Sequence, residues 1–318
     1  MSDLTSQAAD LLDQWLATRL TAEQSDWFKT QINKIAQSNS DRELHITLGL
    51  IPRKFSRDDL SPTAKENTEA SSLLKGWNPS GWSIDQTARI ALLCRVAEKR
   101  GSQFNDTIID LCKMADLAES LALYSGFCLY PHSELLDQQI SEGLRTNIRS
   151  VFEAIAHNNP YPALHFDQHR WNHMVLKALF IDSLLSPIYG LDSRANPELA
   201  GVLCDYAHER WAAGRPVSPE LWRCVGPFAT GSMIDDLERA SQSDNPTEQN
   251  SALIALTHTM SQTPNQTEEA RTTSHTTSQA DTKRAAEIVA RHPDVAKQIA
   301  SGTLTWDSIQ QQLTDNSV

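Results

Sequence analysis

The stretch NPELAGVLCDYAHERWAAGRPVSPELWRC, residues 196–224, contains the signals of two helices joined by a tight turn. Asn196-Pro197-Glu198 places a capping side chain, then proline at the first helical position, then an acid at the positive helix end. Ser218-Pro219-Glu220 repeats this order after the turn at Gly214-Arg215-Pro216. The apolar side chains that recur at helical spacing in the first helix are Leu199, Val202, Leu203 and Tyr206. We therefore predict helix–turn–helix here.

The same signals run along most of the chain. Capping-box patterns precede apolar-periodic runs at residues 21–24 (TAEQ), 40–43 (SDRE) and 83–86 (SIDQ). HNNPYP, residues 157–162, predicts a helix stop followed by an extended turn. The helices expected before residue 261 span about 4–20, 22–37, 41–51, 63–75, 84–100, 105–122, 133–157, 167–184, 197–213, 219–224, 232–242 and 247–260. Because no strand series and no fixed repeat is present, the predicted fold is all-α, either an irregular α-solenoid-like array or a large helical bundle.

Composition divides the chain into three predicted parts. Residues 1–260 form the helical domain, and residues 261–282 hold ten Ser or Thr among 22 without a bulky apolar side chain. Such a segment cannot offset its ordering entropy by burial, so we predict a disordered linker. Residues 283–318 recover apolar periodicity, which Pro293 and the SGT at 301–303 divide into short helices. They are expected to form a small helical C-terminal module.

Charge and cysteine content narrow the class of function. A formal net charge of −12 argues against binding nucleic acid or an anionic membrane non-specifically. The N-terminus has no basic n-region, and no apolar run of about 18 residues exists, so we predict neither a signal peptide nor a spanning helix. The five cysteines are widely spaced without a CxxC pair, which predicts reduced, buried thiols in a cytoplasmic protein.

The helix predicted over residues 167–184 carries polar groups that an apolar helix should not hold. Trp171, Met174, Val175, Ala178 and Ile181 share one face of it, and Leu176, Phe180 and Leu184 share the opposite face. A helix that is apolar all round is usually central and buried. Asn172, His173, Lys177 and Asp182 nevertheless lie on it, and a buried unpaired ion would cost several kcal/mol. These side chains must pair, or line a gap.

The helix that begins at Pro197 raises the same question. Arg210 falls within the stripe of Leu199, while Asp205 and Glu209 share an adjoining face and His208 lies farther round. An inward Arg needs a carboxylate, and the candidates are Asp182, Asp192 and Glu153. Our first interpretation is a buried ion-pair and hydrogen-bond network that holds together the two helices around the AAGRPVSPE turn (residues 212–220). Two alternatives remain: a ligand pocket, or a catalytic site with Asp205 or His208 as acid/base and Arg194 or Arg210 holding an anion.

The candidate residues for such a network or pocket form one short set. They are Asn172, Lys177, Asp182, Asp192, Arg194, Asp205, His208, Glu209 and Arg210. No second His follows HER at zincin spacing, and no recognised spacing joins Asp192, Asp205 and His208 into a metal site. We assign no catalytic residue and predict no metal and no cofactor.

Several long strings in this chain resemble the EboA-domain proteins. The resemblance is carried by GLIPRKF (49–55), WSIDQTARIALL (82–93), LRTNIRSVFEAIAHNNPYP (144–162), WNHMVLKALF (171–180), GLDSRANPELA (190–200) and DYAHERWAAGRPVSPELWRCVGPF (205–228). It covers roughly residues 5–260 and excludes the linker and the C-terminal module. His173 stands where a Gln is common in that family.

The resemblance implies a bacterial accessory role without supplying catalytic residues. EboA-like proteins are encoded beside a prenyltransferase-like membrane protein and several enzymes, and they are associated with making or exporting a specialised metabolite. In cyanobacteria this is a precursor of a sunscreen pigment that moves toward the periplasm. The partners implied are other proteins of that cluster or a small metabolite. The alternatives kept open are an enzyme of unknown reaction and a scaffold for the cluster's enzymes.

Overall fold

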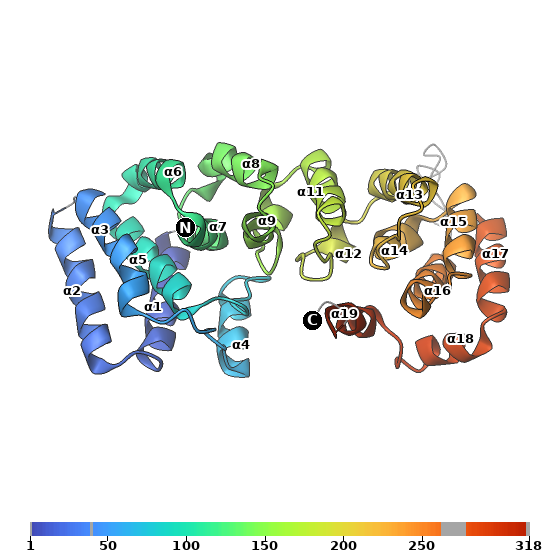
Figure 1. The fold of residues 1–318 in the computed structure, drawn as a ribbon, viewed down its shortest axis with the longest axis horizontal. Helices are drawn as coiled ribbons and strands as arrows, with labels where there is room; N and C mark the ends of the chain where they lie inside the picture. The colour runs from blue at the N-terminus through green and yellow to red at the C-terminus, as the bar shows by residue number, and fades with distance from the viewer. Residues whose placement is uncertain (1, 39–40, 262–277, 316–318) are drawn as a thin grey trace. The chain divides into compact units, whose positions relative to one another are not determined.

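The computed structural model describes residues 2–38, 41–261 and 278–315, and in this part of the chain every regular element is a helix. The predicted all-α class is therefore confirmed. The cap expected at Ser40 and residues 262–277 of the predicted linker lie outside the described residues. Contacts divide the chain into two compact units, Met1–Phe166 and Asp167–Val318, shown in Figure 1. The boundary between the two units falls within the predicted helical domain 1–260, and the C-terminal helices belong to the second unit.

Unit 1 is built around one central helix. Its α-helices are α1 (Ser2–Ala17), α2 (Ala22–Ser38), α3 (Asp41–Lys54), α4 (Ala64–Leu73), α5 (Ile84–Arg100), α6 (Phe104–Met114), α7 (Leu117–Gly126), α8 (Asp137–Arg145), α9 (Arg149–Ala156) and α10 (Tyr161–His165). Helix α5 packs against α1, α2, α3 and α7. Its side chains between Thr87 and Cys94 are all buried, as expected for a helix surrounded by others.

A buried ion pair crosses one turn of α5. Nη1 of Arg89 donates to Oδ2 of Asp85 over 2.6 Å, and the two residues are 2% and 3% exposed. Asp85 also accepts a hydrogen bond from the hydroxyl of Ser83 at 2.5 Å. These bonds satisfy a charge that would otherwise stand unpaired in the core.

Most of the capping motifs predicted from the sequence form the expected hydrogen bonds. Thr21 and Gln24 form the reciprocal capping box, and Ser83 accepts the backbone N–H of Gln86. The single helices predicted over 105–122 and 133–157 are wrong. The first is interrupted where Asp116 caps α7, and the second breaks between Arg145 and Arg149. HNNPYP does stop α9, but its prolines start the short α10 instead of an extended turn.

The pair of Arg19 and Glu66 ties the end of α1 to α4, and it predicts an acid-sensitive contact. Both terminal nitrogens of Arg19 donate to the Glu66 carboxylate at 2.8 Å, and this lowers the pKa of Glu66 to about 2. A carboxyl whose pKa is depressed on folding stabilises the fold above its unfolded pKa, and that contribution is lost as the pH falls toward the folded value. We expect Glu66→Gln to destabilise unit 1 by about 2 kcal/mol at pH 7.

The difference between Glu66→Gln and wild type should shrink between about pH 4.5 and pH 2, as read from hydrogen exchange of α1 and α4 peptides. Asp110→Asn is the control, because Asp110 forms an exposed pair with Lys113. A destabilisation that stays constant across this pH range would show that the ion pair is not its cause.

Unit 2 is also organised by one helix. Its α-helices are α11 (Gln168–Phe180), α12 (Leu191–Arg194), α13 (Pro197–Ala212), α14 (Leu221–Val225), α15 (Ser232–Ala240), α16 (Pro246–Ser261), α17 (Gln279–Ala290), α18 (Pro293–Ala300) and α19 (Trp306–Asp315). Helix α16 contacts α14, α15, α17, α18 and α19. The backbone of Gly226 lies so close to α16 that a Cβ there would stand 2.6 Å from the carbonyl oxygen of Ala255.

The C-terminal helices α17, α18 and α19 pack onto the rest of unit 2 through ion pairs and apolar side chains. Glu238 of α15 accepts from Arg284 of α17 at 2.9 Å and from Arg291, which follows α17, at 2.6 Å. Trp306 and Ile309 of α19 are buried. Pro293 and residues 301–303 separate the three helices, as predicted from the sequence. Residues 279–282, which we expected in the linker, are instead the first turn of α17.

Candidate functional site

The start of α13 is fixed to α11 by a pair of amides. Asn196 caps α13 by accepting the N–H of Leu199 at 2.9 Å, as the sequence predicted. The same side chain donates to Oδ1 of Asn172 at 2.9 Å and accepts from its Nδ2 at 3.3 Å. Asn172 is 5% exposed, so its amide is satisfied by this exchange instead of by water.

Helix α11 ends in a left-handed turn at Asp182. The N–H of Ser183 donates to the carbonyl of Ala178 at 2.8 Å, and that of Asp182 to the carbonyl of Leu179 at 3.3 Å. Asp182 has φ +55°, a conformation that glycine adopts most easily and that Asp tolerates better than most residues. This turn directs residues 183–188 away from the helix axis.

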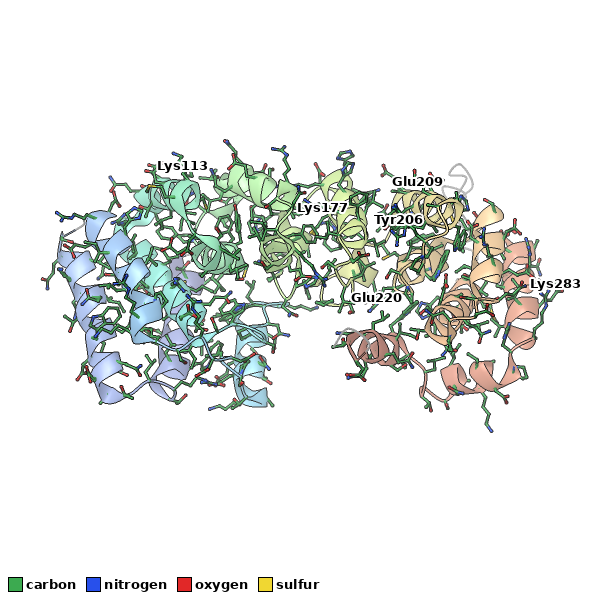
Figure 2. The ribbon with its side chains drawn as sticks, viewed as in Figure 1. Lys113, Lys177, Tyr206, Glu209, Glu220 and Lys283 are labelled. Atoms are coloured by element: carbon green, nitrogen blue, oxygen red, sulfur yellow. The ribbon has the colours of Figure 1, made fainter. Side chains whose placement is uncertain are left out.

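A buried carboxylate holds that loop against the start of α14. Glu220 accepts the N–H of Leu185 at 2.7 Å and that of Ser186 at 2.8 Å, and it is 2% exposed. Figure 2 labels Glu220, and also Tyr206 and Glu209 on α13. The sequence placed Ser218 as a cap and Glu220 at the positive end of a helix. That assignment is wrong, since α14 begins at Leu221 and the Glu220 side chain binds a distant loop.

The loop, α13 and the turn before α14 border a cavity of about 280 Å³ that is open to solvent on one side. Its lining consists of residues 179, 182–184, 206, 210, 216–219, 245, 247 and 313, and we call it the Arg210 cleft. It combines apolar side chains, such as Leu184, Val217 and Leu313, with the charged Asp182 and Arg210. A cavity that combines apolar side chains with a few well-placed polar groups can bind a small metabolite.

Two opposite charges in the cleft are not paired with each other. Arg210 is half-buried, and its Nε donates to the carbonyl of Pro216 at 2.9 Å. Among the described residues no carboxylate forms an ion pair with Arg210, and no cation forms one with Asp182. Tyr206 donates to the carbonyl of Leu179 at 3.2 Å. Burial raises the pKa of the Tyr206 hydroxyl, the Arg210 guanidinium opposes this, and the Asp182 carboxylate adds to it.

Comparison with known proteins identifies the family. A model of the family described as metabolite traffic protein EboA matches residues 8–226, well over half of the chain. The chain belongs to the EboA family. No curated protein and no solved structure matched it significantly. The matched region extends from α1 to the end of α14, so it includes the walls of the Arg210 cleft from residue 179 to residue 219. The remaining wall, at residues 245, 247 and 313, follows the EboA match.

Most of the charged residues that we expected to be buried in this EboA-family protein are at its surface. Asp182, Asp192, Asp205, His208 and Glu209 are exposed. The predicted buried ion-pair network is therefore wrong. Its physical reason is that α11 is not central: Phe180, on the face opposite Trp171, is 76% exposed. A contact of these residues with a ligand remains a prediction.

The partners expected for Arg210 are also wrong. Asp192 accepts two hydrogen bonds from Arg223, at 2.6 and 2.7 Å, and Glu153 pairs with Arg149 at 2.6 Å. Arg210 uses a backbone carbonyl instead. These pairs satisfy two of the three carboxylates that were candidates for Arg210, and Asp182, the third, forms no ion pair with Arg210.

Arg194 and Lys177 lie half-buried outside the lining of the cleft. The guanidinium of Arg194 stacks over the ring of Trp171, 4.7 Å from its centroid, in a cation–π contact. Burial lowers the pKa of Arg194 and of Lys177. Figure 2 labels Lys177 on α11. Both residues come from the set predicted from the sequence, and a ligand contact for either of them stays a prediction.

His208 of the EboA region has a carboxylate partner that the sequence did not indicate. Its Nε2 lies 2.7 Å from Oδ1 of Asp236, which is 8% exposed. Burial, and then Asp236, raise the pKa of the Cys204 thiol, so that sulfur is not activated as a nucleophile. Neither His208 nor Asp205 lines the Arg210 cleft. The acid/base pair suggested from sequence is therefore not directed at this cavity.

Membrane and metal features can be assessed for residues 2–38, 41–261 and 278–315. In these residues no helix is both long and apolar enough to cross a bilayer, and no three His, Cys, Asp or Glu side chains converge as metal ligands. The cysteines are all free, four of them buried and Cys112 half-buried.

Proposed function

We propose that this EboA-family protein is a cytoplasmic accessory protein that binds a small metabolite in the Arg210 cleft. It thereby aids the biosynthesis or export of a specialised-metabolite precursor in bacteria. The observation that carries this proposal is the half-buried Arg210, which lines a cavity of about 280 Å³ without a carboxylate partner among the described residues. A partly desolvated guanidinium that lacks an internal anion is well placed to bind one from a ligand.

The volume of the cleft suits a small metabolite. A cavity of about 280 Å³ lies just below the ~300–1,000 Å³ typical of drug-sized ligands. Its apolar residues, including Leu184, Val217 and Leu313, would bury a hydrocarbon or ring portion. The Glu220 carboxylate fixes one wall, so this wall is preorganised before a ligand enters.

The enzyme alternative rests on a different observation, the 2.7 Å contact between His208 and the buried Asp236. An imidazole held by a carboxylate is a common general base. The accessory role is favoured because the cleft and this pair do not share a residue. His208→Gln separates the two: metabolite output should be preserved in the accessory role and lost in the enzyme.

Mass spectrometry of co-purified small molecules tests the proposed function. The full chain is purified from cells that make the metabolite, and bound molecules are released from wild type and from Arg210→Met. We expect one metabolite to co-purify with the wild type. Its amount should fall ~10-fold or more in the variant, because the guanidinium that binds its anionic group is lost. Asp205→Asn is the control, since Asp205 is an exposed acid of α13 outside the cleft.

Melting curves establish that Arg210→Met is folded, and Ser218→Trp, which fills the cleft, provides a second loss of binding. If wild type, Arg210→Met and Ser218→Trp release the same small molecules in the same amounts, the cleft is not their binding site and the proposal fails.

A further inference from the structure

The two unpaired charges of the Arg210 cleft come from different elements. Asp182 lies in the turn that ends α11, and Arg210 lies in the last turn of α13. Both line the cavity, and they are not within ion-pair distance of each other. The cleft therefore presents a cationic and an anionic group separately.

Among the described residues, the guanidinium of Arg210 makes one hydrogen bond within the protein. Its Nε donates to the Pro216 carbonyl, which leaves the two terminal nitrogens for another acceptor. A carboxylate matches that edge of a guanidinium with two parallel hydrogen bonds. The acceptor expected at Arg210 is thus a planar acid group.

Asp182 provides the negative charge of the cleft. Its backbone is held at φ +55° by the two hydrogen bonds that close α11, so the position of its Cα is fixed independently of its side chain. The carboxylate has no cation partner among the described residues and can accept from an ammonium group. A ligand that carried only an acid would leave this carboxylate unused.

The remaining lining is mixed: Ser183, Ser218, Asn245 and Thr247 lie beside apolar side chains that can contact the body of a ligand. These apolar side chains include Leu179, Leu184, Val217, Pro219 and Leu313. At ~30 Å³ for each water, a cavity of about 280 Å³ displaces roughly nine waters, which suits a molecule of about a dozen non-hydrogen atoms.

We infer that the Arg210 cleft takes a small zwitterion with an apolar body, an α-amino acid or a close derivative, with its carboxylate on Arg210 and its ammonium on Asp182. This inference rests on the proposed metabolite-binding function and names the class of ligand. The apolar side chain of the amino acid lies against the leucines, Val217 and Pro219 of the cleft.

Calorimetric titration with three probes of one carbon skeleton tests the class. L-Phenylalanine carries both charged groups, 3-phenylpropanoate only the acid, and 2-phenylethylamine only the amine. The full-length wild type should bind L-phenylalanine ~10-fold or more tightly than either single-charge probe. Arg210→Met should weaken the amino acid and the acid, and Asp182→Asn should weaken the amino acid and the amine.

Two variants control for charge and folding. Asp182→Gly removes the carboxylate, and glycine readily adopts the φ of +55° found at this position. This variant should therefore lose affinity for the amino acid without losing stability. Lys283→Met removes an exposed cation of α17, labelled in Figure 2, and should change no affinity.

Any other outcome of these titrations contradicts a zwitterionic ligand. Equal binding of the acid and the amino acid, unaffected by Asp182→Asn, would show that only an anion is recognised. Absence of binding by all three probes would also reject an amino-acid ligand. The metabolite released from the native protein is judged separately, so the proposed function can survive either result.

Discussion

Replacing Arg89 by methionine is expected to destabilise unit 1 by about 3–5 kcal/mol, the cost of leaving one partner of a buried pair alone. Arg89 is 2% exposed and bonds Asp85 at 2.6 Å inside α5, the central helix of the unit. Methionine fills part of the volume but cannot neutralise the carboxylate that remains. The loss should appear as faster hydrogen exchange of α5 peptides, because these peptides report on the stability of unit 1 and not of unit 2.

The double variant Asp85→Asn with Arg89→Met tests the assigned cause. It removes the stranded charge, so we expect it to recover a large part of the loss, because replacing both members of a buried pair is often nearly neutral. Lys113→Met is the surface control, since its pair with Asp110 is exposed. If the double variant is as unstable as the single one, the penalty arises from packing and not from charge.

Glu220→Ala is expected to produce the largest effect in unit 2, a loss of about 3 kcal/mol. The carboxylate accepts two backbone N–H groups, and hydrogen bonds to charged groups contribute about 1.5–3 kcal/mol each. Its removal leaves the N–H groups of Leu185 and Ser186 without their acceptor, and Leu185 is fully buried. Exchange of the amides at 183–188 should accelerate, and ligand binding in the Arg210 cleft should weaken with it.

Glu220→Gln refines this prediction. Glutamine keeps one acceptor oxygen but replaces the other with a donor, so we expect an intermediate loss. Glu209→Ala is the matched control, because Glu209 is an exposed acid of α13, labelled in Figure 2. Unchanged exchange at 183–188 in Glu220→Ala would mean that this carboxylate does not hold the loop.

Sequence signals that act within one turn of helix predicted the fold well. Asn196, Thr21 and Ser83 cap helices as expected because the atoms they bind lie three residues away. Pro293 likewise starts α18 as predicted. Helix breaks at Asp116 and Arg145 were missed because the apolar periodicity continues across them.

The burial of each helix and the partners of its polar side chains depend on tertiary packing, which the sequence did not predict. An apolar face on each side of α11 suggested a central helix, yet Phe180 is exposed while α5 and α16 are central. Asp182 was one of three carboxylates that the sequence suggested as a partner of Arg210, and the structure places both in the lining of one cavity without pairing them. The sequence placed Glu220 and Tyr206 on helices but could not predict their tertiary hydrogen bonds, because the partners lie 27 to 35 residues away in the chain.

The central claim is that the Arg210 cleft binds a metabolite, and NMR of labelled methyl groups tests it most directly. The methyls of Leu184, Val217 and Leu313 line the cleft, while Leu12 and Leu44 are buried in unit 1. Adding the low-molecular-weight fraction of a producing cell extract should shift the first three in wild type, and none of them in Arg210→Met. Shifts that occur elsewhere, or that persist unchanged in Arg210→Met, would contradict the claim.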